Sequence, residues 1–198
     1  EVVEGLSYRR LREEAIAFAP RLYAAGLEPG DRVGLVAETE GDFARAFFAC
    51  QYAGMIPAPL PLPAPLGGRE AYVAQIARML ESADAAALLG PATITGWMAE
   101  APNPALRFVG PIGDLPQAGA WRDLPVIAPQ GPCYLQFSSG STRFPMGVLV
   151  THEAAMANAA AIVRHGLVVQ PADRAVSWLP LYHDMGLVGF LLAPLTCQ

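Results

Sequence analysis

The sequence predicts an α/β fold: a doubly wound, mostly parallel sheet with flanking helices. Short apolar runs typical of buried strands alternate with amphipathic segments of helical period along residues 1–90. Such alternation with short connections is the pattern of βαβ units, whose strands are parallel. The chain is 53% hydrophobic, which suits a sheet buried on both faces and equally a piece of a larger body.

The first predicted element is an amphipathic helix near the start of the chain. Apolar side chains recur in it at three- and four-residue steps: Tyr8, Leu11, Ala15, Phe18 and Leu22. Ser7 is the expected N-cap and Gly26 the expected end. Pro20 is expected to kink or split this helix, because proline lacks the N–H that a helix interior needs.

Strands and helices then alternate. We predict a strand at 33–37, a helix at 42–53, a strand at 56–62, a helix around 72–80 and a strand at 86–89. Prolines occupy every second position after Ile56: Pro57, Pro59, Pro61, Pro63 and Pro65. Prolines so spaced exclude a central position in a sheet, so this strand should be short and followed by an extended loop.

The second half predicts a hairpin, then a helix and one more strand. Residues 133–137 and 147–151 are the expected hairpin strands, 154–165 the helix, begun near Thr151, and 175–179 the last strand.

This pattern divides the chain into three segments. Residues 1–90 form the first α/β unit, and residues 91–130 form a Pro- and Gly-rich connection of loops and edge elements. Residues 131–198 contain the hairpin together with the last predicted helix and strand.

The connection between the hairpin strands is rich in hydroxyl groups. It begins Ser138, Ser139, Gly140, Ser141, Thr142, Arg143. Free backbone N–H groups in such a loop can wrap an anion, because glycine lets successive amides converge, and a polyphosphate is the ligand suggested. It is not a P-loop, since the lysine is missing and a strand comes after it. From the residues alone, an ordinary Ser/Gly turn is an equal alternative.

Residues 138–147 resemble the phosphate-binding signature of the adenylate-forming enzymes, the superfamily of acyl-CoA synthetases, luciferases and adenylation domains. Arg143 stands where glycine is usual, and Met146 where lysine is usual. Residues 178–187, Trp-Leu-Pro-Leu-Tyr-His-Asp-Met-Gly-Leu, resemble the superfamily's next motif, W-x-P-x-x-H-x-x-G. This spelling, with Leu-Gln before the aromatic of the first motif, is similar to the fatty acyl-AMP ligase branch in particular.

The resemblance implies a site for ATP and Mg²⁺. The residues it assigns to the β- and γ-phosphates are Ser138, Ser139, Gly140, Ser141 and Thr142. Thr142 would also lie close to Mg²⁺, and Gly147 would serve backbone geometry. Arg143 would supply the charge that Met146 does not, or be a solvated arginine at a loop tip.

By the same resemblance His183 lies beside the acyl carboxylate and the α-phosphate, where an imidazole N–H can donate to developing negative charge. Substrate contacts are implied for His183, Asp184, Met185 and Gly186. Asp184 would fix the imidazole tautomer or cap a helix beginning at Met185, and we favour the cap. Gly186 and Gly189 would permit close packing near an acyl tunnel, or be packing glycines only. Without its motif, a lone histidine is more often structural.

The implied function is ATP-dependent activation of a medium or long-chain fatty acid to an acyl-adenylate. The acyl group would pass to the phosphopantetheine thiol of an acyl carrier protein. The alternatives are an acyl-CoA synthetase, which uses coenzyme A, and a non-catalytic nucleotide- or acyl-binding homologue.

The resemblance covers only the front portion of such an enzyme. We therefore expect a partial N-terminal, AMP-binding domain, with the C-terminal domain absent and the fragment inactive alone.

Charge and composition limit other functions. The net charge of −5 argues against non-specific nucleic-acid binding. No apolar run reaches the roughly 20 residues of a membrane span. The three cysteines are scattered without metal-ligand spacing, which suits a reducing cytoplasm.

Overall fold

The fold is that of a computed structural model, which describes residues 5–36, 38, 40–64, 67–101, 103–118, 123–138 and 146–197. In chain order the elements are α1 (Tyr8–Ala24), β1 (Arg32–Val36), α2 (Gly41–Tyr52), β2 (Ile56–Leu60), α3 (Arg69–Ser82), β3 (Ala85–Leu89), α4 (Ala92–Ala99), β4 (Phe108–Gly110), the 3₁₀ turn η1 (Ile112–Asp114), β5 (Pro132–Phe137), β6 (Gly147–Thr151), α5 (His152–Ala161), the π-helical segments η2 (Ile162–Gly166) and η3 (Met185–Leu192), and α6 (Ala193–Leu195).

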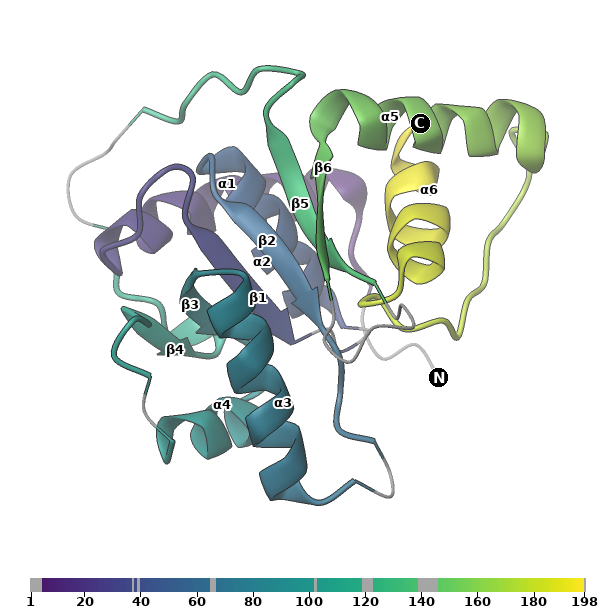
Figure 1. Cartoon of the computed structure of the whole chain (residues 1–198). Helices are drawn as coiled ribbons and strands as arrows, with labels where there is room; N and C mark the ends of the chain where they lie inside the picture. The colour runs from purple at the N-terminus through teal and green to yellow at the C-terminus, as the bar shows by residue number, and fades with distance from the viewer. Residues whose placement is uncertain are drawn as a thin grey trace.

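Four strands form a parallel sheet in the order β2-β1-β3-β4 (Figure 1). Buried residues on the two faces of β1 belong to different clusters, Val33 and Leu35 to one and Val36 to the other. The first cluster contains residues of α1 and α2, and the second contains residues of α3 and α4. Helices therefore cover both faces, and the predicted doubly wound fold is confirmed.

Helix α1 has the predicted start but is not split. The Ser7 hydroxyl accepts a hydrogen bond from the Arg10 N–H at 3.2 Å, and Gly26 lies just beyond the helix with a φ of +82°. Pro20 lies inside one continuous helix and is buried, so of the two expected effects the split is wrong and the kink remains a prediction. Ala19 and Leu22 next to it are fully buried, so the helix is well packed around the proline.

Strand β2 lies at the edge of the parallel sheet, as its prolines predict. Ile56 donates its N–H to the Asp31 carbonyl, so the side of β2 that Ile56 uses faces β1. Pro57 and Pro59 alternate with it and face the opposite side, where their missing donors break no ladder bond. The β5–β6 hairpin packs beside β2 (Figure 1).

Residues 91–130 contain more regular structure than predicted. The segment predicted as loops includes helix α4, which packs Ile94 and Met98 into the second cluster. Strand β4 takes the edge next to β3, in keeping with the expected edge elements. The division of the chain at 90 and 130 remains a prediction.

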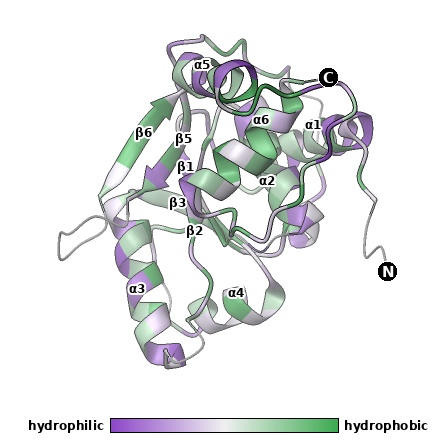
Figure 2. Cartoon of the chain, turned by 90° about the vertical axis from the view of Figure 1, so that its right-hand side faces the viewer, coloured by the Kyte–Doolittle hydropathy of each residue, from purple (hydrophilic) through white to green (hydrophobic). Residues whose placement is uncertain are grey.

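The hairpin is confirmed and the strand at 175–179 is not. β5 and β6 pair antiparallel, and the Thr151 hydroxyl caps α5 by accepting from the Ala154 N–H. Residues 175–179 form no strand, and Val176 and Trp178 are 85% and 89% exposed. An extended apolar segment becomes a strand only when another strand pairs with it, and no described strand does. The outer strand β6 is also apolar along much of its length (Figure 2).

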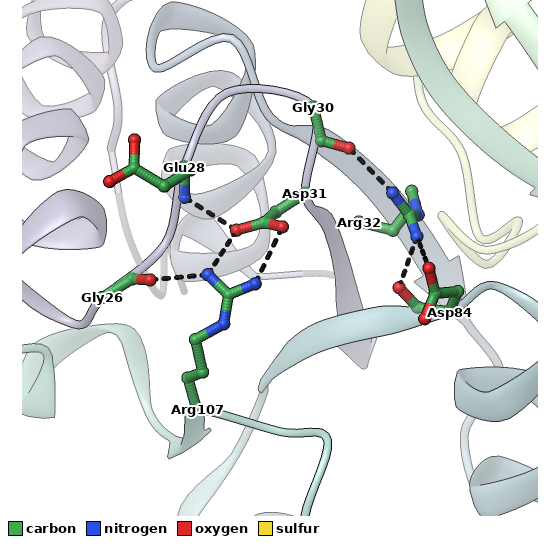
Figure 3. Close-up of polar contacts among 7 residues, drawn as sticks. All are labelled: Gly26, Glu28, Gly30, Asp31, Arg32, Asp84 and Arg107. Carbon is green, nitrogen blue, oxygen red and sulfur yellow. Dashed lines mark hydrogen bonds and ion pairs between the residues drawn. The ribbon is translucent and has the colours of Figure 1, made fainter.

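An ion-pair cluster ties the loops at the amino end of the sheet (Figure 3). Arg107 donates two parallel hydrogen bonds to Asp31, at 2.7 and 3.0 Å, and a third to the Gly26 carbonyl at 2.6 Å. Asp31 also accepts the Glu28 N–H at 2.7 Å. Beside it, Arg32 pairs with Asp84 and donates to the Ala83 carbonyl at 2.8 Å.

We expect Arg107→Met to lower the free energy of unfolding by about 1 kcal/mol, because the bidentate pair is partly solvated. Arg107→Lys should lose part of this, since an ammonium cannot bond both carboxylate oxygens in parallel. Urea unfolding at 0.05 M and 1 M salt measures both. A loss that does not shrink at high salt would contradict an electrostatic origin.

Candidate functional site

The loop end of the β5–β6 hairpin holds the first candidate residue, Ser138. Ser138 donates its backbone N–H to the Met146 carbonyl at 2.9 Å, and its hydroxyl lies 3.3 Å from the same oxygen. The Ser138 amide therefore closes the hairpin and is not a free anion donor here, whereas its hydroxyl can turn. The other predicted phosphate contacts, and the candidate magnesium contact among them, lie outside the described residues: Ser139, Gly140, Ser141, Thr142 and Arg143.

Gly147 opens β6, and its φ is not in the left-handed region. A Cβ there would lie 3.0 Å from Leu135 Cδ2 and 3.2 Å from its Cδ1, so the Leu135 side chain would have to shift slightly to admit it. Met146, just before it, is 61% exposed and offers no charge where the resembling motif has lysine.

The second candidate, His183, lies in a tight turn before η3. Its backbone N–H donates to the Pro180 carbonyl at 3.1 Å, and its backbone carbonyl accepts from the Leu187 N–H at 2.9 Å. The side chain is 53% exposed, so the imidazole remains accessible. The predicted strand before it is absent, so the turn itself, and not a strand end, fixes its place.

Asp184 caps η3, the alternative we favoured, and its carboxylate also lies beside the imidazole. Its Oδ1 accepts the Met185 N–H at 2.7 Å, which caps η3, and lies 2.6 Å from His183 Nδ1. The Met185 N–H also lies 3.3 Å from His183 Nδ1, so the cap and the imidazole share one backbone donor. A role of Asp184 in fixing the imidazole tautomer remains a prediction.

Strand β5 lies close behind this pair. Burial raises the pKa of Tyr134 to about 12, and the charges of Cys133 and Asp184 add to the effect. Tyr134 packs its ring against Phe47 of α2, with centroids 5.9 Å apart. The hairpin, the His183 turn and α2 therefore share one part of the core.

Gly186 is buried where a side chain has no room. A Cβ there would overlap the Pro180 carbonyl oxygen, with the Pro180 carbon at 2.9 Å and the Leu179 oxygen at 3.2 Å. These are backbone atoms of the turn that carries His183, so they cannot swing aside. At Gly189, one turn further on, nothing lies within 4 Å of the Cβ position. Of the two glycines, only Gly186 is required by a close approach.

The two candidate regions are joined by a residue that sequence reasoning passed over. Gln136 donates from Nε2 to the Tyr182 carbonyl at 2.8 Å and to the Phe137 carbonyl at 3.2 Å. In the sequence, Gln136 stands out only as part of the Leu-Gln pair before the aromatic residue of the first motif. Nothing there indicates that its amide reaches a residue 46 positions away.

A hollow of about 800 Å³ borders the same turn. Its apolar wall includes Leu179, Leu181 and Phe190, and Asp42 and Arg45 lie on the side of α2. Arg45 is nearly buried and pairs with Asp42 at 2.9 Å and with Glu14 at 2.5 Å, which holds the pKa of Glu14 below its usual value. These ion pairs join α1 to α2 on the polar side, which Glu40 also lines.

The described residues contain neither a metal-ligand cluster nor a membrane-spanning helix. No three histidine, cysteine, aspartate or glutamate side chains group as a metal site in the described ranges, so Mg²⁺ remains an expectation. No described helix is both long and apolar enough to cross a membrane.

Known proteins match this chain along its length. The family model of the AMP-binding enzymes matches residues 2–197. A Caulobacter vibrioides protein, provisionally named an acyl-CoA synthetase, is 60% identical over 200 residues, covering 100% of this chain and 35% of that protein. The long-chain-fatty-acid–AMP ligase FadD26 of Mycobacterium tuberculosis is 32% identical over 208 residues, covering 98% of this chain and 34% of that protein.

The fold matches a solved structure as well. One from a study of fatty acyl-adenylate ligases of E. coli and L. pneumophila superposes with a TM-score of 0.90 and 43% identity, covering 98% of this chain and 35% of that chain. This chain therefore spans about a third of the proteins it matches. The AMP-binding model covers nearly every residue, and both motif regions fall within it, so the chain belongs to the adenylate-forming family of AMP-binding enzymes.

Proposed function

We propose that the full-length protein activates a medium or long-chain fatty acid with ATP, giving an acyl-adenylate. The observation that carries this proposal is the direct link between the two motif regions, the Gln136–Tyr182 hydrogen bond of 2.8 Å. It holds the hairpin that would bind the phosphates against the turn that carries His183. Reacting groups held by these two regions would meet where that chemistry needs them.

In this reaction a carboxylate oxygen attacks the α-phosphorus of ATP, and the bond from that phosphorus to the pyrophosphate oxygen breaks. The products are acyl-adenylate and pyrophosphate. His183, with Asp184 beside its Nδ1, would donate from Nε2 to charge that develops between carboxylate and α-phosphate. Met185 and Gly186 would complete the substrate side of the site. Mg²⁺, close to Thr142, would neutralise phosphate charge when bound.

For the phosphate loop, we propose that Ser138, Ser139, Gly140, Ser141 and Thr142 hold the β- and γ-phosphates, with Arg143 supplying a cation. Replacing both Ser141 and Thr142 by alanine should lower kcat/KM for ATP at least about tenfold, because charge-assisted phosphate contacts are lost. Thr151→Ala is the control, since that hydroxyl caps α5 and should change stability alone. Unchanged ATP kinetics in the double variant would remove the loop from the mechanism.

For the acceptor, we propose the phosphopantetheine thiol of an acyl carrier protein, in keeping with the motif spelling and the likeness to FadD26. Coenzyme A is the second candidate, because the relative with 60% identity carries an acyl-CoA synthetase name. We also propose a cytoplasmic location.

The experiment is mass spectrometry of the full-length protein with dodecanoic acid, ATP and Mg²⁺, offering coenzyme A and holo carrier protein separately. Acyl-AMP that persists with coenzyme A and moves to the carrier supports the ligase. Acyl-CoA supports the synthetase. ATP binding without either product would support a non-catalytic homologue, in which uncharged Met146 marks a lost function.

A further inference from the structure

In the side-chain amide of Gln136, the nitrogen makes hydrogen bonds, and the oxygen is buried without a donor among the described residues. Nε2 donates to the Tyr182 and Phe137 carbonyls, and the buried atom is Oε1. Both neighbours of Nε2 are carbonyl oxygens, which cannot donate, so that terminal atom must be the NH₂ group. The orientation of the amide is therefore settled by chemistry.

The carbonyl that Gln136 holds belongs to the peptide unit between Tyr182 and His183. The other polar group of the same unit, the His183 N–H, donates to the Pro180 carbonyl at 3.1 Å. A peptide unit is planar, so a hydrogen bond at each end fixes its orientation. The next peptide unit is restrained as well, because the His183 carbonyl accepts the Leu187 N–H at 2.9 Å, and the two units together direct the His183 Cα–Cβ bond.

One of these two bonds comes from within the turn, and the other comes from the hairpin. Among the described residues, Gln136–Tyr182 is the hydrogen bond that joins β5 to the turn at 180–185. Gln136 lies two residues before Ser138, where the loop begins. A shift of the strand end is therefore transmitted to the peptide unit of His183.

Since Oε1 has no donor among the described residues, the polar contribution of the side chain comes from Nε2, through its bonds to the Tyr182 and Phe137 carbonyls. We propose that Gln136 is a positioning residue, which couples the end of the phosphate hairpin to the His183 turn. Its kinetic consequence depends on the proposed function, but its effect on the turn does not.

The test uses the full-length protein with Gln136→Leu, and Gln51→Leu as the matched control. Gln51 also donates its amide to a β5 carbonyl, that of Cys133 at 3.2 Å, and among the described residues this bond does not involve the turn. In Gln136→Leu, kcat for dodecanoate-dependent ATP–pyrophosphate exchange should fall about tenfold or more, with KM for ATP within about twofold of wild type. Its Tm should fall no more than that of Gln51→Leu, because each variant loses one amide that donates to a backbone carbonyl. Gln51→Leu should leave kcat unchanged.

Two further readouts separate positioning from general damage. Hydrogen–deuterium exchange of the peptide covering residues 182–190 should speed up in Gln136→Leu and not in Gln51→Leu, whether or not the protein is active. In a His183→Ala background, Gln136→Leu should change kcat less than about twofold, because the group it positions is gone.

Unchanged exchange of that peptide would overturn the proposal, as would additive kinetic effects of Gln136→Leu and His183→Ala. An inactive wild type in which exchange still responds to Gln136→Leu would refute the proposed function and leave the coupling supported.

Discussion

Gly186→Ala should lower the rate of the proposed fatty-acid activation by the full-length protein about a hundredfold. The new Cβ would overlap the Pro180 carbonyl oxygen and lie 2.9 Å from its carbon, so the turn or the start of η3 must move. His183 is in that turn, bonded to the same Pro180 carbonyl. A displacement of about 1 Å at a reacting group can cost two orders of magnitude in rate.

Gly189→Ala is the control for helix propensity and for loss of a glycine. It lies in the same segment, and its Cβ would meet nothing within 4 Å. We expect it to have wild-type kinetics in the ATP–pyrophosphate exchange assay. Equal activities of the two variants would show that the close approach at Gly186 does not position His183.

Phe47→Ala should be the most destabilising of these substitutions, by about 3–5 kcal/mol. The ring is fully buried and contacts Phe43 and Phe48 within α2 and Tyr134 of β5. Its removal leaves a cavity where the helix packs against the hairpin. Such a loss is a large part of the stability of an ordinary domain.

Urea unfolding of the full-length protein measures this effect. Phe47→Leu, which keeps most of the volume, should cost about 1.5 kcal/mol or less. Tyr8→Ala, at the exposed start of α1, should change little. A Phe47→Ala midpoint no lower than that of Tyr8→Ala would contradict the importance of this contact.

Local sequence patterns predicted the helices and strands whose formation depends mainly on their own residues. The helical period from Tyr8 to Leu22 predicts α1, and the alternating prolines predict the edge position of β2. Helix α4 was missed because its sequence, ATITGWMA, has β-branched residues and a glycine and little amphipathic contrast. Trp178 and Val176 suggested a strand by composition, but pairing is decided by a partner that local sequence does not show.

The site was predicted less completely than the fold. Motif resemblance singled out His183 and Gly186, and the turn brings them together through Pro180. It could not indicate that Gln136 reaches Tyr182, because that contact depends on how the hairpin lies against the turn. The roles of residues 139–143 remain predictions, since the described residues do not include them.

The prolines of β2 have a mechanical consequence for the hairpin. Pro57 and Pro59 present no N–H on the side of β2 away from β1, where β5 packs. The parallel sheet and the β5–β6 hairpin therefore contact each other there without forming one continuous hydrogen-bonded sheet. Because no backbone ladder joins β5 to β2, a displacement of the hairpin would leave the hydrogen bonds of the parallel sheet intact.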